Sequence, residues 1–243
     1  RGEVHGLIGE SGSGKSQTSF AVLGLLPTGG RVVSGSIVFE GVDLTSGTAK
    51  AHSAVRGKKV AYIPQEPMSN LDPMFTIGSQ LTEPLRRTLG MTKQDARRRA
   101  LDLLARVGIP DPERTFNAYP HQVSGGMAQR VLIAGAVSSD PDLLIADEPT
   151  TALDVTIQAE VLDLIRDLQS EFQMAVLLVT HNFGVVADLC DRVSVMKDGR
   201  IVETGPVRAI FADPQHAYTQ SLLDAMLDED GPVRPPLTQG GEA

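Results

Sequence analysis

One segment limits the possible folds of this 243-residue chain more than any other, namely GESGSGKS at 9–16. The apolar run VHGLIG (4–9) before it predicts a strand, and SQTSFAVLGLL (16–26) after it has the pattern of a helix. Glycines here let consecutive backbone N–H groups turn toward phosphate oxygens, and the helix N-terminus adds positive potential. This P-loop predicts an α/β fold that binds a nucleoside triphosphate.

The P-loop residues have separate expected roles. Lys15 is expected to reach the β- and γ-phosphates, and the Ser16 hydroxyl is expected to coordinate Mg²⁺. The other residues that we expect to surround the phosphates are Gly9, Glu10, Ser11, Gly12, Ser13 and Gly14.

A second motif, LLIADE (143–148), is an apolar strand that ends in two carboxylates. Asp147 is expected close to the Mg²⁺ held by Ser16, because the carboxyl ends of parallel strands meet at one edge of a sheet. Glu148 can align and deprotonate a water for attack on the γ-phosphate. An acidic pair is also common in loops, so this interpretation depends on the P-loop that precedes it.

The remaining pattern predicts the fold class. Further strands are expected at 35–41, 59–65, 142–147, 174–181 and 192–205, the last with a hairpin turn at Asp198-Gly199. The stretch of about 74–140 is helical in pattern. We predict a largely parallel core sheet with an antiparallel β part and an inserted helical subdomain, in a single domain of 1–243. The tail at about 228–243 is acidic, then rich in Pro and Gly, and is expected to be poorly ordered.

Composition narrows the possible partners. With 30 acidic and 22 basic residues the net charge is −8, which offers no broad basic field for nucleic acid. Cys190 is the single cysteine and excludes an intrachain disulfide or an all-cysteine metal cluster. No apolar run approaches the roughly 18 residues of a spanning helix. A role at a membrane would therefore require a partner.

Between the P-loop and LLIADE, the sequence VSGGMAQR resembles the signature of ABC ATPases. The core of that signature, Ser124-Gly125-Gly126, is intact, whereas Val123 and Met127 depart from the usual LSGGQ. The resemblance implies the P-loop NTPase fold of the ABC ATPase type. It also implies that this helix points its N-terminus at the γ-phosphate of ATP bound by a second subunit. Ser124 is also a good helix N-cap, and both roles can hold.

Three further residues match motifs of the same family, in the same order. Gln65 resembles the Q-loop glutamine, which senses Mg²⁺ and the attacking water and links to the membrane subunit. Asp154, in TALD, resembles the D-loop residue that crosses the dimer interface. His181 resembles the switch histidine that contacts the γ-phosphate and Glu148, although a histidine at a strand end is often structural. The resemblance thus implies ATP and Mg²⁺ as cofactors and Glu148, His181 and Gln65 as catalytic residues.

A finer match points to the branch that powers dipeptide, oligopeptide and nickel importers. It is carried by 65–85, 147–165 and 210–225, and HAYTQSLL (216–223) is the most informative block because catalysis does not need it. The alternative for that block is a surface helix capped by Thr219. Two departures from the family matter. The chain begins after the aromatic A-loop strand, so we expect the domain to lack its first strand or strands, and the carboxyl-terminal cysteine cluster of many members is absent.

The resemblance implies an ATP-hydrolysing subunit that energises an importer of peptides, nickel or a related solute. Its expected partners are a second nucleotide-binding subunit, identical or not, and two transmembrane permease subunits docked at 66–85. An extracytoplasmic solute-binding protein would act indirectly, and the expected location is peripheral, on the cytoplasmic face of the membrane. The alternative is a soluble ABC ATPase of DNA repair or translation, although such proteins usually carry long coiled coils or two cassettes.

Overall fold

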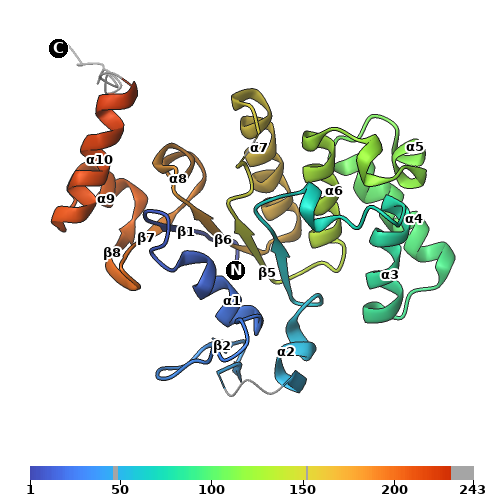
Figure 1. The fold of residues 1–243 in the computed structure, drawn as a ribbon, viewed down its shortest axis with the longest axis horizontal. Coiled ribbons are helices and arrows are strands. Elements are labelled where there is room, and N and C mark those ends of the chain that lie inside the picture. Colours follow the sequence, from blue (N-terminus) through green and yellow to red (C-terminus); the bar gives the residue numbers. More distant parts are fainter. Residues whose placement is uncertain (46–48, 152, 231–243) are drawn as a thin grey trace, which may run out of the picture.

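The computed structural model describes residues 1–45, 49–151 and 153–230, arranged as shown in Figure 1. Most of the tail that the sequence predicts to be poorly ordered, 231–243, lies outside the described residues, as does Ala152 of the TALD motif. Residues 228–230 instead complete the last helix, α10.

A six-stranded sheet in the order β4-β5-β6-β1-β7-β8 forms the centre of the molecule. Neighbouring strands are parallel except for the β7–β8 hairpin, so the predicted mixture of parallel and antiparallel strands is confirmed. Because β1, β5 and β6 are parallel, the loops that follow them open on one edge of the sheet. The strands are β1 (Val4–Ile8), β4 (Val60–Ile63), β5 (Leu143–Asp147), β6 (Ala175–Thr180), β7 (Arg192–Lys197) and β8 (Arg200–Pro206).

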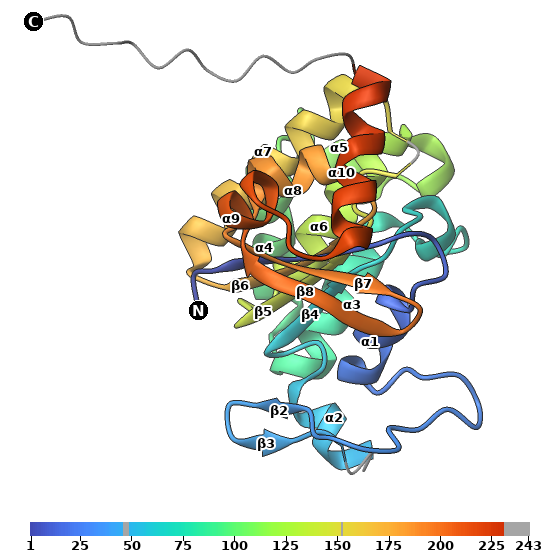
Figure 2. The same cartoon turned by 90° about the vertical axis from the view of Figure 1, so that its left-hand side faces the viewer.

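Helices cover both sides of the sheet, with α1 on one side and α7, α8 and α9 on the other in Figure 2. The segment between β4 and β5 contains α3, α4, α5 and α6, which gather beside the sheet in Figure 1. The helices are α1 (Lys15–Leu23), α2 (Ala49–Val55), α3 (Ile77–Leu89), α4 (Lys93–Arg106), α5 (Pro112–Asn117), α6 (Gly125–Val137), α7 (Val155–Phe172), α8 (Phe183–Leu189), α9 (Val207–Ala212) and α10 (Ala217–Asp230), with 3₁₀ turns at Met68–Asn70 and Pro120–Gln122.

Polar caps determine where most of these helices begin. A side-chain oxygen just before the first turn accepts a backbone N–H group and satisfies a donor that the helix itself leaves free. The residues that cap α3 to α8 in this way are Thr76, Thr92, Asp111, Ser124, Asp154 and Asn182. Among the described residues, no helix combines the length and the apolar character needed to cross a membrane.

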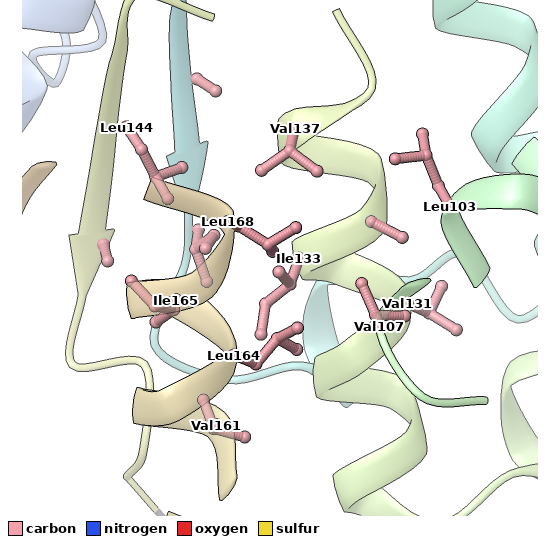
Figure 3. Close-up of a cluster of buried hydrophobic side chains, with 14 of the residues drawn as sticks. Leu103, Val107, Val131, Ile133, Val137, Leu144, Val161, Leu164, Ile165 and Leu168 are labelled. Atoms are coloured by element: carbon pink, nitrogen blue, oxygen red, sulfur yellow. The ribbon is translucent and has the colours of Figure 1, made fainter. Parts of the chain in front are cut away.

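The main core lies between the sheet and the helical layer and is centred on α6 (Figure 3). Ile133 of α6 is fully buried and lies between α7, which contributes Ile165, and the residues that follow α4. Leu144 on β5 joins the same cluster. Truncating a side chain of this kind to alanine typically costs about 2–5 kcal/mol. The packed part of α6 is therefore fixed against α7 and β5 by apolar contacts.

Two local predictions were wrong. The strand expected at 35–41 is reduced to β2 (Val38–Phe39), which pairs with β3 (Val42–Asp43) in a separate two-stranded sheet rather than in the main one. The first helix ends at Leu23 rather than at residue 26, because Gly24 adopts the left-handed conformation (φ 64°) and closes it. The predicted Asp198-Gly199 turn does join β7 to β8.

The alternative for HAYTQSLL was also wrong. Thr219 lies inside α10 and is fully buried, so it does not cap an exposed helix. The carboxylate of Glu203, on β8, accepts the backbone N–H groups of Gln215 (2.8 Å) and His216 (3.2 Å) just before α10 begins. The helix is therefore anchored to the sheet rather than lying free on the surface.

Candidate active site

The P-loop lies between β1 and α1, as predicted, and Lys15 begins the helix. Its side chain is only 6% exposed, and Nζ donates to the carbonyl oxygens of Gly9 (2.8 Å) and Glu10 (2.9 Å). Burial lowers the pKa of Lys15, and the charges of Glu148 and Asp147 oppose that shift. The ammonium group is thus held inside the loop, where bound phosphates would lie.

The β7–β8 hairpin packs against the P-loop. A Cβ added at Gly9 would lie 2.1 Å from the carbonyl oxygen of Met196, so only glycine fits there. The N–H group of Gly199 donates to the carbonyl of Ser13 (3.0 Å). Gly14 takes φ 103°, a conformation that residues with a Cβ rarely adopt. Glycine is therefore required at two P-loop positions for two different reasons.

The first carboxylate, Asp147, ends β5 and is 3% exposed. The Ser16 hydroxyl donates to Oδ1 (3.3 Å) and the Tyr62 hydroxyl donates to Oδ2 (3.2 Å). Burial raises the pKa of Asp147, and these two hydrogen bonds counteract part of that rise. The structure therefore brings together the Ser16 and Asp147 side chains that the sequence predicted to share a metal ion.

The second carboxylate, Glu148, collects three hydrogen bonds. Oε2 accepts from Gln65 Nε2 (2.8 Å) and from the Thr151 hydroxyl (2.8 Å), and Oε1 lies 3.0 Å from His181 Nδ1. Its backbone takes φ 48°, which is unusual for a residue with a Cβ and is typical of strained functional positions. In this backbone conformation the carboxylate of Glu148 points toward Gln65 and His181.

The pKa of Glu148 reflects two opposing effects. Burial alone would raise it, but the hydrogen bonds from His181 and Thr151, together with the charges of His181 and Lys15, hold the pKa below its usual range. The carboxylate is therefore ionised at neutral pH. An ionised carboxylate fixed at this position can accept a proton from water.

Two adjoining hollows follow the P-loop. The larger, of about 510 Å³, is lined by Gly9, Glu10, Ser11, Gln65, Glu148, Thr151, His181, Phe183 and Leu222. The smaller, of about 260 Å³, is lined by Ser11, Gly12, Gly14, Lys15, Ser16, Gln17, Gln65 and Glu148. Every predicted P-loop, Q-loop and switch residue except Ser13 thus lines a hollow that also contains Glu148.

The signature and D-loop residues are placed differently. The Ser124 hydroxyl accepts the N–H group of Met127 (3.3 Å), so Ser124 is the predicted N-cap of α6. Ser124 and Gly125 are exposed, and α6 groups with α3 to α5 in Figure 1. Asp154 caps α7 through the N–H group of Ile157 (3.0 Å) and is also exposed. Within the described part of the chain, neither motif lines the two hollows.

The donor set fits Mg²⁺. Ser16 offers a hydroxyl, Asp147 a carboxylate and Gln65 an amide oxygen, which are the hard oxygen ligands that Mg²⁺ prefers when phosphates complete its shell. No cluster of three or more His, Cys, Asp or Glu side chains suited to a metal ion occurs among the described residues. A site that shares Mg²⁺ with phosphate needs no such cluster.

Several residues of the site were not predicted from the sequence, among them Thr151, which donates to Glu148. Tyr62 on β4 pairs with Ile145 on β5. Asp147 lies two residues after Ile145, so Tyr62 and Asp147 lie on the same face of the sheet. That register could have indicated Tyr62, but strand pairing is not evident from one sequence. Gln129, on α6 and 1% exposed, donates to the carbonyl oxygen of Pro149 (2.7 Å) and links the signature helix to the segment after Glu148.

Comparisons with known proteins agree with this geometry. Residues 1–151 match the family described as ABC transporter. The chain is 50% identical over 226 residues, 93% of its length, to the oligopeptide transport ATP-binding protein AmiE of Streptococcus pneumoniae. It is also 50% identical over 226 residues to the dipeptide transport ATP-binding protein DppD of Haemophilus influenzae. The chain spans 64% of the first relative's length and 68% of the second's.

A solved structure is similar over most of the chain. It is the dimeric, post-hydrolysis state of the ATP-binding cassette MJ0796 bound to ADP and Pi, with a TM-score of 0.74 and 29% identity. The match covers 85% of this chain and 86% of that one. The matched sequence, the shared fold and the arrangement of the P-loop, Asp147 and Glu148 agree, and the chain belongs to the ABC transporter family of ATP-binding proteins.

Proposed function

We propose that this protein hydrolyses ATP and thereby energises an ABC importer of peptides. The observation that carries the proposal is the position of Glu148. Its carboxylate is held by three hydrogen bonds beside the P-loop, and its pKa is lowered. A base in this state can take a proton from water next to the terminal phosphate.

The polar residues in and beside the two hollows have separate proposed roles in this reaction. Lys15 would exchange the Gly9 and Glu10 carbonyls for phosphate oxygens and neutralise their charge. His181 would orient the carboxylate of Glu148 and contact the terminal phosphate. Ser16, Asp147 and Gln65 would hold Mg²⁺, which when bound withdraws charge from the phosphates.

A second nucleotide-binding subunit, identical or different, would complete the site. Ser124 and Gly125 are exposed at the start of α6 and lie outside the hollows, so their N–H groups are available to ATP held by another chain. Asp154 would cross the same interface. The dimeric state of the similar cassette supports this arrangement.

The membrane partners follow from the relatives and from one exposed segment. Relatives named for oligopeptide and dipeptide transport are equally similar to this chain, which favours peptides as the solute and import over DNA repair or translation. Met74 (77% exposed) and Phe75 (54% exposed) lie in 66–85 and offer an apolar surface to two permease subunits. A peripheral location on the cytoplasmic face and a solute-binding protein outside the membrane complete the proposed importer.

The variant Glu148→Gln tests the proposal. It keeps the shape of the side chain but removes the proton acceptor, so hydrolysis should fall by about 10²–10⁴-fold while ATP binding survives. The variant should then accumulate as an ATP-bound dimer, measured by size-exclusion chromatography with light scattering. Glu113→Gln, whose side chain is exposed on α5, is the matched control and should hydrolyse ATP normally. A Glu148→Gln protein with normal turnover would contradict the proposed function.

A further inference from the structure

Helix α10 contacts the P-loop directly, although it lies far from the P-loop in the sequence. The Tyr218 hydroxyl accepts the backbone N–H group of Glu10 at 3.2 Å, across 208 residues of sequence. The Tyr218 side chain is 6% exposed, so this contact is part of the packed structure. Leu222, one turn further along α10, lines the larger hollow together with Glu148 and His181.

The contact acts on one peptide group that also holds Lys15. The N–H group that donates a hydrogen bond to Tyr218 belongs to the Gly9–Glu10 peptide. The carbonyl oxygen of the same peptide accepts a hydrogen bond from Lys15 Nζ at 2.8 Å. In a planar trans peptide the N–H and C=O groups point in opposite directions. A hydroxyl that fixes one side of the peptide therefore fixes the direction of the other.

Tyr218 is itself held from two sides. Lys197, at the end of β7, places Nζ 4.4 Å from the centre of the tyrosine ring, a cation–π contact. Glu203 anchors the residues just before α10 through Gln215 and His216. The hydroxyl thus meets Glu10 at a defined position, as a positioning group must.

From these contacts we infer that Tyr218 is a positioning residue for the P-loop, which sets the Gly9–Glu10 peptide and through it the resting place of Lys15. The inference rests on the proposed function, since it assumes that the loop binds ATP. Losing the hydroxyl would leave the peptide free to rotate, and a loop that must reorder on binding binds less tightly.

The position of the peptide predicts which nucleotide is affected. Gly9, Glu10 and Ser11 line the larger hollow together with Glu148 and His181, where the third phosphate would lie. Gly12 and Gly14 line only the smaller hollow, next to Lys15 and Ser16. Lys15 is expected to contact the third phosphate as well as the second, and the Gly9–Glu10 peptide borders the larger hollow. Tyr218 should therefore affect the binding of ATP more than the binding of ADP.

The variant Tyr218→Phe tests the inference, because it keeps the ring and removes only the hydroxyl. Affinities of the purified protein for a non-hydrolysable ATP analogue and for ADP would be measured by calorimetry with Mg²⁺. We expect the affinity for the ATP analogue to fall by about two- to tenfold, the range for one neutral hydrogen bond, and the affinity for ADP to change less than about twofold. No change, or an equal loss for both nucleotides, would overturn the inference.

A matched control separates positioning from stability. Gln220→Ala removes a hydrogen bond to the carbonyl of Pro214 (2.7 Å) at the start of the same helix without touching the P-loop. It should leave the ratio of the two affinities unchanged, and a shift equal to that of Tyr218→Phe would overturn the inference. If Tyr218→Phe does not fold, Lys197→Met provides a second test, because it removes the cation over the tyrosine ring. Lys197→Met should lower the ratio of ATP-analogue affinity to ADP affinity to a smaller extent. An unchanged ratio would overturn the inference.

Failure of the inference and failure of the proposed function give different results. An unmodified protein that binds neither nucleotide would contradict the proposed function. If the unmodified protein binds both nucleotides and the Tyr218→Phe variant binds each with the same affinity as the unmodified protein, only the role of Tyr218 is contradicted.

Discussion

The P-loop edge of the sheet and the start of helix α6 are built in opposite ways. At the P-loop edge, polar groups of this chain satisfy one another: Glu148 accepts three hydrogen bonds, and Lys15 donates to two carbonyls. At the start of α6, Gly125 is exposed, and a Cβ added there would meet nothing within 4 Å. The polar groups of Glu148 and Lys15 are therefore paired within the chain. The exposed start of α6 has the open geometry that the proposed shared site requires.

The largest expected effect is the loss of ATP affinity when Lys15, in the P-loop region, is replaced. Lys15→Ala removes a cation that would contact two phosphates, and hydrogen bonds to charged groups are worth about 1.5–3 kcal/mol each, so ATP affinity should fall by about 10²–10⁴-fold. The fold should survive, because the Lys15 amine bonds only loop carbonyls. Fluorescent-nucleotide titration and circular dichroism would measure both properties. A folded variant with normal ATP affinity would refute the assignment of Lys15 as a phosphate-binding residue of the P-loop.

Changing the other region should give the reverse pattern. Ser124→Arg puts a bulky cation at the exposed start of α6, so a single chain should bind ATP normally while turnover falls by about 10²-fold, the usual cost of losing a backbone-donor site. Added to Glu148→Gln, it should abolish the ATP-bound dimer seen by light scattering. If Ser124→Arg weakened ATP binding by the isolated chain, the two regions would not be separate.

The pH dependence of hydrolysis tests the P-loop edge more finely. His181→Ala removes a hydrogen bond and a charge that lower the pKa of Glu148, so that pKa would rise. Because the base must be ionised, the acid limb of the pH–rate profile should move to higher pH, and the neutral-pH rate should fall by about 10–100-fold. His181→Gln retains an N–H donor and should keep the limb close to its original position. An acid limb that stays in place in His181→Ala would contradict this account of Glu148.

The smallest expected effect concerns the link between the regions. Gln129→Leu leaves the buried Pro149 carbonyl without its donor, which should lower the free energy of unfolding by about 1 kcal/mol. Denaturant unfolding followed by circular dichroism would measure it. An unchanged free energy of unfolding would show that α6 and the segment after Glu148 are held together by apolar packing alone.

The sequence by itself determined the chemistry of the site and the class of the fold. The P-loop spacing predicts a strand before it and a helix after it, and β1 and α1 occupy those positions. Glycines and polar caps carry this information locally, since conformation at Gly14 or Ser124 depends on the residue itself. The short strand at 35–41 was predicted too long, because strand length depends on the partner available for pairing.

Only the tertiary structure decided which groups far apart in the sequence form hydrogen bonds with one another. Tyr62 reaches Asp147 because β4 pairs with β5 in one particular register. Tyr218 reaches Glu10 because α10 packs against β7 and β8. Neither contact leaves a periodic signal in the chain, since each depends on the packing of elements far apart in sequence. The residue types of the site can therefore be predicted from short motifs, but the groups that position those residues depend on how the whole chain packs.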